Sequence, residues 1–364
     1  MAAGLSFCGE DQTASQKCAL LRDVEPNLKP KLRNAAATAL RDRNCIQLNL
    51  DPAHSLLLTG EVGKIRQFLN CLDGTHTVAE LIETYPFAQS ALFSLAKRGL
   101  LETELLNSQL TADLTPIQLQ QFIISQRSYQ AVNGDLDYAQ LRLTRLTNSY
   151  LWLATVGPAS ALLSLMLAQQ QIGRIKLEKL EEFATADLPP WLISSAIDIS
   201  NLLQQASAKI KLTQPPGTPA PDLIIIADEP WLDPAITRSY LNRGIPHLYI
   251  APTVSQVSVG PLVLPGQTSC LNCAEQIISN VDRSWPTMRN LIGPNQVDQT
   301  DWALLQLSVS FAATAIISGI SSGSWDNSPL LNQQWRFRLP GPRIEVHPQP
   351  ASMFCECQWG KLAA

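Results

Sequence analysis

The chain is poor in charge and in histidine. Only 16% of its 364 residues are charged, and it has four histidines. The net charge of -4 argues against a protein that grips nucleic acid mainly through phosphates, because such binding needs a positive field. The opening stretch MAAGLSFCGEDQTASQKCALLRD lacks the charged-then-apolar order of a secretory signal, so we expect a cytoplasmic protein.

Several catalytic signatures are also missing. The sequence has no Ser-His-Asp order, no paired-carboxylate signature, no Walker loop and no helix with His-x-x-x-His spacing. A nucleotide-binding turn of the Rossmann type needs several glycines, whereas TVGPASALLS keeps only Gly157. Pro158 also removes one N–H donor from that turn. We therefore expect that this chain does not bind ATP.

Two uncharged stretches, 146–173 and 302–325, need a membrane test. Gly157 and Pro158 interrupt the first, so it cannot form one long helix. The second is almost long enough to span a bilayer, but it carries Gln306 and several hydroxyl side chains. We expect a helix buried in the core of an α/β domain and no membrane span.

The chain has eight cysteines, too few and too scattered for a disulfide scaffold at this length. Cys270 and Cys273 form a Cys-x-x-Cys pair in a stretch, 260–276, that has Glu275 as its one charged residue and reads as a loop, and Cys355 and Cys357 form a second pair. Thiolates bind zinc in a tetrahedron, and each pair can supply one side of it. These residues therefore predict a structural Zn²⁺ site. A redox pair, plain buried thiols and His347 as a substitute ligand stay open as alternatives.

Changes of pattern divide the chain into four parts. Residues 1–27 read as a flexible tail, 28–108 as strands followed by three short helices, 109–148 as a polar helical connector and 149–364 as an α/β domain. In the second part, CIQLNL alternates like a half-buried strand, and Thr77 with Glu80 forms the capping box of a helix. Strands followed by three helices predict a winged-helix module.

From residue 149 onward, strands alternate with helices. YLWLATVG and DLIIIAD are continuous apolar runs, which is typical of parallel strands buried on both faces. The alternation predicts a doubly wound α/β fold of the Rossmann type. Glu178 follows one strand, and Asp228 and Glu229 follow another, at the edge where such folds bind ligands. A surface charge or a helix cap explains these acids equally well.

A winged-helix module can contact DNA or a peptide. Its last helix carries only Lys97 and Arg98 as basic residues, fewer than a DNA-recognition helix needs. A hairpin edge beside a helix can instead receive an extended peptide as an added strand. We favour peptide binding without nucleic acid, and a DNA-binding regulator stays open.

Parts of both halves resemble one known family. The α/β domain resembles the ThiF-like (ocin-type) partner proteins of YcaO cyclodehydratases, which belong to the biosynthesis of azole-modified ribosomal peptides such as thiopeptides. The module at 28–108 is similar to their PqqD-like peptide-recognition element. The motifs that carry the resemblance are GIPHLYIAPTVSQVSVGPLVLPGQTSCLNC, Trp285-Pro286, HPQPASMFCEC, LNLDPAHSLLLTG and LDGTHTVAELI.

The resemblance implies a non-catalytic scaffold. Such a protein binds the leader of a precursor peptide and presents it to a YcaO cyclodehydratase for azoline formation. By position, the receiving strand would be 55–59, with Leu56 and Leu58 on one face, and the neighbouring helix would add Phe93, Lys97 and Arg98. Simple core packing of the three apolar residues is the alternative. The four paired cysteines match the family's structural zinc site.

The wider ThiF-like and ubiquitin-activating-like enzymes adenylate a carboxylate with ATP. The resemblance therefore also carries a second reading, an adenylating enzyme of the ThiF/MoeB type. The degenerate glycine turn is the reason that the scaffold is the main prediction. The oligomeric state stays open, with a homodimer as one alternative.

Overall fold

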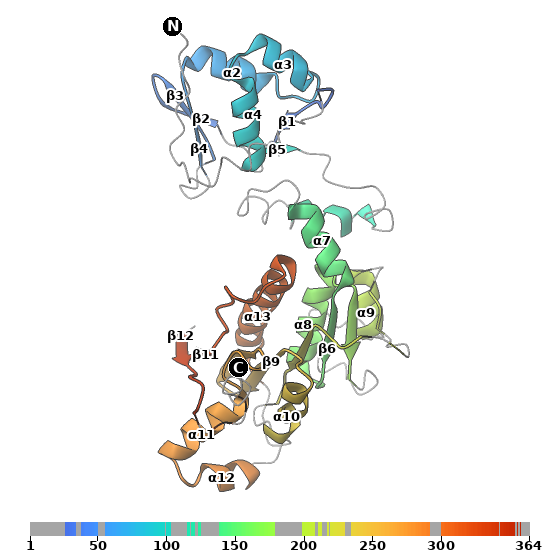
Figure 1. Ribbon diagram of the computed structural model, residues 1–364, viewed down its shortest axis with the longest axis vertical. Coiled ribbons are helices and arrows are strands. Elements are labelled where there is room, and N and C mark those ends of the chain that lie inside the picture. The colour runs from blue at the N-terminus through green and yellow to red at the C-terminus, as the bar shows by residue number, and fades with distance from the viewer. Residues whose placement is uncertain are drawn as a thin grey trace. The chain divides into compact units, whose positions relative to one another are not determined.

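The chain folds into two compact units, shown in a computed structural model (Figure 1). Unit 1 comprises Met1–Ala112 and Ile123–Leu141, and unit 2 comprises Asp113–Phe122 and Arg142–Ala364. The structure describes residues 26–33, 38–49, 55–98, 100–102, 115–116, 118–120, 123–124, 138–178, 199–207, 210–212, 217, 219–229, 234–291, 300–341, 343–353, 355 and 357. The domain boundaries expected at 27, 108 and 148 stay predictions.

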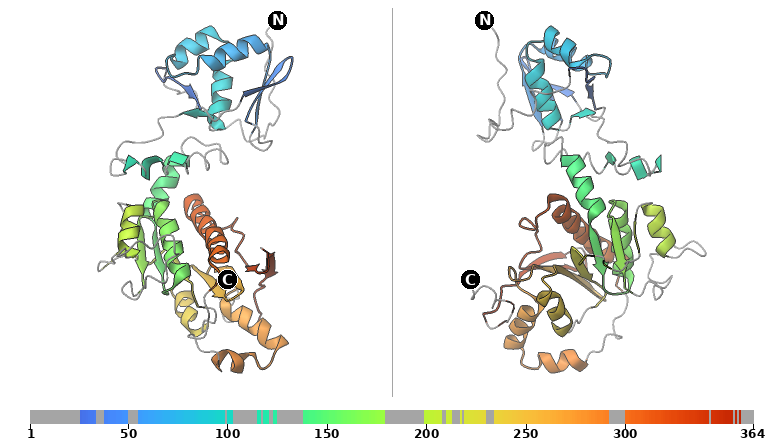
Figure 2. Two further views of the ribbon diagram at one scale, coloured as in Figure 1. Left: turned by 180° about the vertical axis from the view of Figure 1, so that it is seen from behind. Right: turned by 45° about the vertical axis from the view of Figure 1, so that its right-hand side comes forward.

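The described residues of unit 1 up to Glu102 form a small antiparallel sheet, a two-stranded pair and the helices α2, α3 and α4 (Figure 2). The sheet has the order β2-β3-β4, so β2 and β4 are its edges. Its strands are β2 (Thr38–Asp42), β3 (Cys45–Leu48) and β4 (Leu56–Thr59), while β1 (Lys31–Leu32) pairs with β5 (Leu101–Glu102). The helices are α2 (Val62–Asn70), α3 (Val78–Thr84) and α4 (Ala88–Lys97). The expected strands and three helices are present in this part of the chain.

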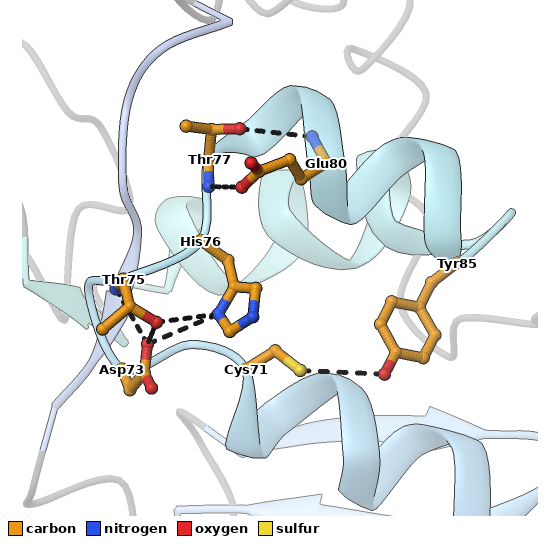
Figure 3. Close-up of polar contacts among 7 residues, drawn as sticks. All are labelled: Cys71, Asp73, Thr75, His76, Thr77, Glu80 and Tyr85. Atoms are coloured by element: carbon orange, nitrogen blue, oxygen red, sulfur yellow. Dashed lines mark hydrogen bonds and ion pairs between the residues drawn. The ribbon is translucent and has the colours of Figure 1, made fainter.

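Local hydrogen bonds decide where α3 begins (Figure 3). The Thr77 hydroxyl accepts a bond of 3.3 Å from the backbone N–H of Glu80, and the Glu80 carboxylate accepts one of 2.8 Å from the backbone N–H of Thr77. This is the capping box expected from the sequence. The bond from the Thr77 N–H also lowers the pKa of Glu80. The Cys71 Sγ lies 3.7 Å from the Tyr85 hydroxyl, which links the ends of α2 and α3.

One apolar core holds unit 1 together. Phe68 of α2 is fully buried and makes edge-on contacts with the rings of Tyr85 and Phe87, at centroid distances of 5.6 and 5.3 Å. The sheet contributes Leu48 and Leu58, which are also fully buried. Each such side chain contributes about 1.5–3 kcal/mol when it is buried, so the core rather than helix propensity stabilises these short helices.

Unit 2 is built on a seven-stranded mixed sheet of order β12-β11-β10-β9-β8-β6-β7. The expected α/β fold with a parallel-rich sheet is confirmed, because β6 to β9 are parallel to one another. These strands are β6 (Tyr150–Leu153), β7 (Arg174–Leu177), β8 (Leu223–Ile226) and β9 (His247–Thr253). The antiparallel strands are β10 (Gln256–Val263), β11 (Gln333–Arg338) and β12 (Arg343–Pro348).

The strand β10 corrects one expectation. We expected residues 260–276 to form a loop, but the first four residues of this stretch belong to β10, and Leu262 and Val263 pair with β9. Gly260 is needed there, because a Cβ atom at this position would lie 2.6 Å from the Gln333 carbonyl oxygen. Gly260 and Pro261 lower the strand propensity here, but the glycine allows two strands to approach each other closely.

Helices cover the sheet of unit 2 (Figures 1 and 2). One group of neighbouring helices comprises α8 (Pro158–Gln169), α9 (Ile199–Ala206) and α13 (Trp302–Ser322). A second group comprises α10 (Pro234–Asn242), α11 (Leu271–Val281) and α12 (Trp285–Leu291), and α7 (Tyr138–Asn148) precedes β6. Within the described part of the chain, α13 is the one helix long and apolar enough to cross a membrane by length and composition. It packs on α8, β10 and β11, as expected for a core helix.

The burial of His247 makes the stability of the fold depend on pH. It begins β9, its side chain is fully buried, and its Nδ1 lies 3.1 Å from the Ile245 carbonyl oxygen. The carbonyl can only accept, so Nδ1 carries the proton. Burial lowers the pKa of His247 to about 4. The unfolded chain protonates near its ordinary pKa of about 6.5, so protonation favours unfolding as the pH falls below that value.

We expect His247 to remove about 2 kcal/mol from the free energy of unfolding between pH 7 and pH 5, because only the unfolded state takes up its proton there. Urea unfolding of wild type and His247→Asn at both pH values measures this contribution. The Asn variant retains a donor toward Ile245 but does not titrate. His347→Asn is the control, because His347 is part-exposed. An equal pH dependence in wild type and His247→Asn would contradict the prediction.

Candidate functional site

Four cysteine sulfur atoms from two distant segments meet beside α11. Cys270 caps the N-terminus of α11 and Cys273 lies in its first turn, while Cys355 and Cys357 follow β12. The Sγ–Sγ distances are 3.8 Å for Cys270–Cys273, 3.5 Å for Cys270–Cys355 and 3.4 Å for Cys273–Cys357, and all four atoms lie within 4.8 Å of one another. A tetrahedral zinc site with bonds of about 2.3 Å has sulfur–sulfur edges of about 3.8 Å.

The chemistry of this cysteine cluster also fits a metal. Three of the four side chains are buried and Cys357 is half-buried, so the cluster has little access to solvent. A hydrogen bond from Cys270 lowers the pKa of the Cys273 thiol to about 4, and the same shared proton raises the pKa of Cys270. The Asn272 side chain donates to the Cys355 Sγ at 3.3 Å. A thiolate supported by donors is the form that binds metal.

The four predicted ligands are therefore brought together, and they can hold an ion such as zinc. Four thiolates close the coordination sphere, so such an ion would tie the C-terminal segment to α11 and would have no open position for a substrate. His347 lies on β12, with its Nε2 3.4 Å from the Glu345 carboxylate, and is not part of the cluster.

We expect purified protein to contain about one zinc ion per chain, and Cys270→Ser to reduce the metal content and the unfolding temperature together, because metal binding at such a site stabilises the fold. Metal analysis and thermal unfolding measure the two effects. Cys71→Ser is the matched control, because Cys71 lies in unit 1, outside the cluster. A metal-free wild type with the same stability would contradict the prediction.

The carboxyl ends of the parallel strands form a second candidate site. The chain passes from β6 through Gly157 into α8, while Glu178 follows β7 and Asp228 lies just beyond β8. In the sheet order β8-β6-β7, these strands are neighbours and point the same way, so their ends share one edge. Open α/β sheets bind ligands at this edge.

Gly157 and Asp228 fit closely together at this edge. The backbone of Gly157 has a φ of 151°, and a Cβ atom there would lie 2.5 Å from the Asp228 Cγ. The Asp228 carboxylate accepts bonds from the N–H of Ala159 at 2.7 Å, from the N–H of Ser160 at 2.8 Å and from the Ser160 hydroxyl at 2.7 Å. Asp228 thus caps α8 from another strand, and only glycine fits beneath it.

Two further acids border the same edge. The Glu178 carboxylate accepts a bond of 2.9 Å from the Trp152 indole N–H and lies 2.9 Å from the Lys176 ammonium, which sits over the Trp152 ring. Burial, and then the nearby charge of Asp228, raises the pKa of Glu229. The sequence pointed to all three acids, but it did not identify Ser160 or the Trp152–Lys176 stack. A hydroxyl in the first turn of α8 is too common to be a signal by itself.

The five residues expected to bind a peptide lie on β4 and α4, which are neighbours in unit 1. Leu56 and Leu58 are buried in the core, Phe93 is half-buried and Lys97 is exposed. Arg98 donates a bond of 2.9 Å to the Ser55 carbonyl oxygen and so holds the start of β4 against the end of α4. The outer edge of β4 is unpaired among the described strands. A peptide-binding role for these residues stays a prediction.

Comparison with known proteins gives a likeness of fold. No family model and no curated protein matches the chain. Among solved structures, E. coli MccB with ATP has a TM-score of 0.63 at 16% identity, over 90% of this chain and 99% of MccB. The microcin C7 biosynthetic enzyme MccB in complex with N-formylated MccA has a TM-score of 0.63 at 15% identity, over the same shares of the two chains. PaaA has a TM-score of 0.58 at 16% identity, over 87% of this chain and 99% of PaaA.

These findings correct the main functional expectation. The chain shares its fold with a biosynthetic enzyme solved with ATP and with N-formylated MccA, over 90% of its length. The prediction of a non-catalytic scaffold is therefore wrong, and the adenylating alternative fits better. The physical reason lies at the turn after β6. We counted missing glycines, but only Gly157 meets a neighbour closely enough to require glycine there.

Proposed function

We propose that this protein is an ATP-dependent enzyme that activates a carboxylate of a ribosomally made peptide as an acyl adenylate. The observation that carries the proposal is the likeness in fold, over 90% of the chain, to an enzyme whose structures hold ATP and a peptide. The strand–glycine–helix turn at Gly157 supports it, because that turn lies where nucleotides bind in such sheets. ATP thus replaces the earlier expectation of no nucleotide.

The proposed reaction needs two substrates in contact. A carboxylate oxygen of the peptide attacks the α-phosphorus of ATP, the bond to the β-phosphate breaks, and pyrophosphate leaves with the bonding electrons. The chain's own residues would position ATP. Glu178 lies after the second parallel strand, where an acid can bond a ribose hydroxyl, and the start of α8 lies after the first, where phosphate is bound.

Unit 1 is the proposed peptide-binding part. As the edge strand of the described three-stranded sheet, β4 can add an extended segment through backbone hydrogen bonds, and the neighbouring α4 can contact its side chains. Half-buried Phe93 offers an apolar contact, and exposed Lys97 offers a charge for an acidic leader. Buried Leu56 and Leu58 would act by shaping the floor under the strand, and Arg98 by holding its end. A YcaO-type partner stays a prediction from the resemblance alone.

We expect the purified protein to exchange labelled pyrophosphate into ATP when the precursor peptide encoded beside its gene is present, because adenylate formation is reversible. Gly157→Ala should reduce exchange by about 100-fold, since an added Cβ displaces the turn by about 1 Å or more. Gly63→Ala is the matched control, because no atom lies near the Cβ position at Gly63 in α2. Absence of exchange with peptide and ATP would contradict the proposed function.

We expect Lys97→Ala to weaken binding of an acidic leader peptide by up to about fivefold, because a surface charge pair contributes up to about 1 kcal/mol. Fluorescence anisotropy with the labelled leader at low and high salt measures it. Lys64→Ala is the control, since Lys64 is exposed on α2 and paired with Glu61. Equal binding by both variants would exclude Lys97 from the peptide site.

A further inference from the structure

We propose that Asp228 is an internal competitor for phosphate: its carboxylate occupies the start of α8 and must leave before a nucleotide phosphate can bind there. The inference rests on the proposed nucleotide site and adds a regulatory contact to it. It follows from where the donors of the first helical turn are directed, from the space above Gly157, and from charge.

The donors of the first turn of α8 are already used. Pro158, the first helical residue, has no N–H. The N–H groups of Ala159 and Ser160 both bond to Asp228, as does the Ser160 hydroxyl. The N–H of Ala161 bonds to the Gly157 carbonyl oxygen at 2.9 Å, within the helix. A phosphate at this helix end therefore competes with the Asp228 carboxylate for the Ala159 and Ser160 donors.

The space is also taken. The Asp228 Cγ would lie 2.5 Å from a Cβ atom on Gly157, so the carboxylate rests directly above the turn. A phosphate needs the same close approach to the glycine backbone. The backbone beneath Asp228 is fixed, because the Ala227 N–H donates to the Thr155 hydroxyl at 2.8 Å. The movement that frees the site therefore falls on the Asp228 side chain itself.

Because of their charge, the Asp228 carboxylate and a phosphate cannot occupy the start of α8 together. Asp228 and a phosphate are both anions, and two anions cannot share two backbone donors without repulsion. The carboxylate satisfies the helix end and interacts favourably with its dipole. A small anion gains little by replacing it, whereas ATP brings further contacts from its base and ribose. Asp228 would thus select against free phosphate and pyrophosphate.

The test measures pyrophosphate affinity by isothermal titration calorimetry on the full chain, in buffer without magnesium and without chelator. We expect Asp228→Ala to bind pyrophosphate at least about tenfold more tightly than wild type, because the substitution removes a competing anion from the helix end. Ser160→Ala should lie between the two, because it weakens the hold on Asp228 and keeps both backbone donors. Circular dichroism establishes that each variant is folded.

Asp222→Ala is the matched control. It removes the same charge from the start of β8, where Asp222 accepts a bond from the Tyr150 N–H at 2.7 Å, away from α8. Tighter binding by Asp228→Ala alone supports the inference. Equal, weaker or absent binding by Asp228→Ala, or equal tightening by Asp222→Ala, overturns it. Pyrophosphate–ATP exchange by wild type tests the proposed function separately, so either idea can fail while the other stands.

Discussion

The contact between the Asp228 carboxylate and the start of α8 determines the geometry of the candidate site. It joins the end of β8 to the helix that follows β6, and it satisfies two backbone N–H groups that the helix cannot pair internally. Because the carboxylate lies directly above residue 157, any side chain larger than hydrogen there would collide with it. The glycine, the helix and the strand end are therefore fixed as one piece.

A second constraint acts on the C-terminal segment of unit 2. The cysteine cluster joins α11 to the segment after β12, two parts of the chain separated by more than 80 residues. That segment follows the edge strand of the sheet, where fewer neighbours hold the chain in place. A tetrahedral metal there would supply the stabilisation that packing does not, and it would leave the edge at β6 and β8 free for chemistry.

Much of the fold could be predicted because the signals are local. The capping box of Thr77 and Glu80 and the apolar run of β8 depend on neighbouring residues only. The strand β10 could not be predicted, because its pairing with β9 and β11 overrides the low strand propensity of Gly260 and Pro261. The four cysteines were found from two short spacings, whereas their meeting depends on the whole sheet. Ser160 and Trp152 acquire partners only in three dimensions.

The functional error has the same origin. A count of glycines considers only the order of residues in a nucleotide-binding turn. The physical requirement is that the backbone of the turn can approach an anion closely. Here one glycine meets that requirement, and the anion that now approaches it belongs to the protein. A helix that begins with proline also has fewer free donors, so it is easier for one internal carboxylate to satisfy. Under the proposed nucleotide site, the features that made the turn look unable to hold phosphate describe a phosphate position that the Asp228 carboxylate occupies.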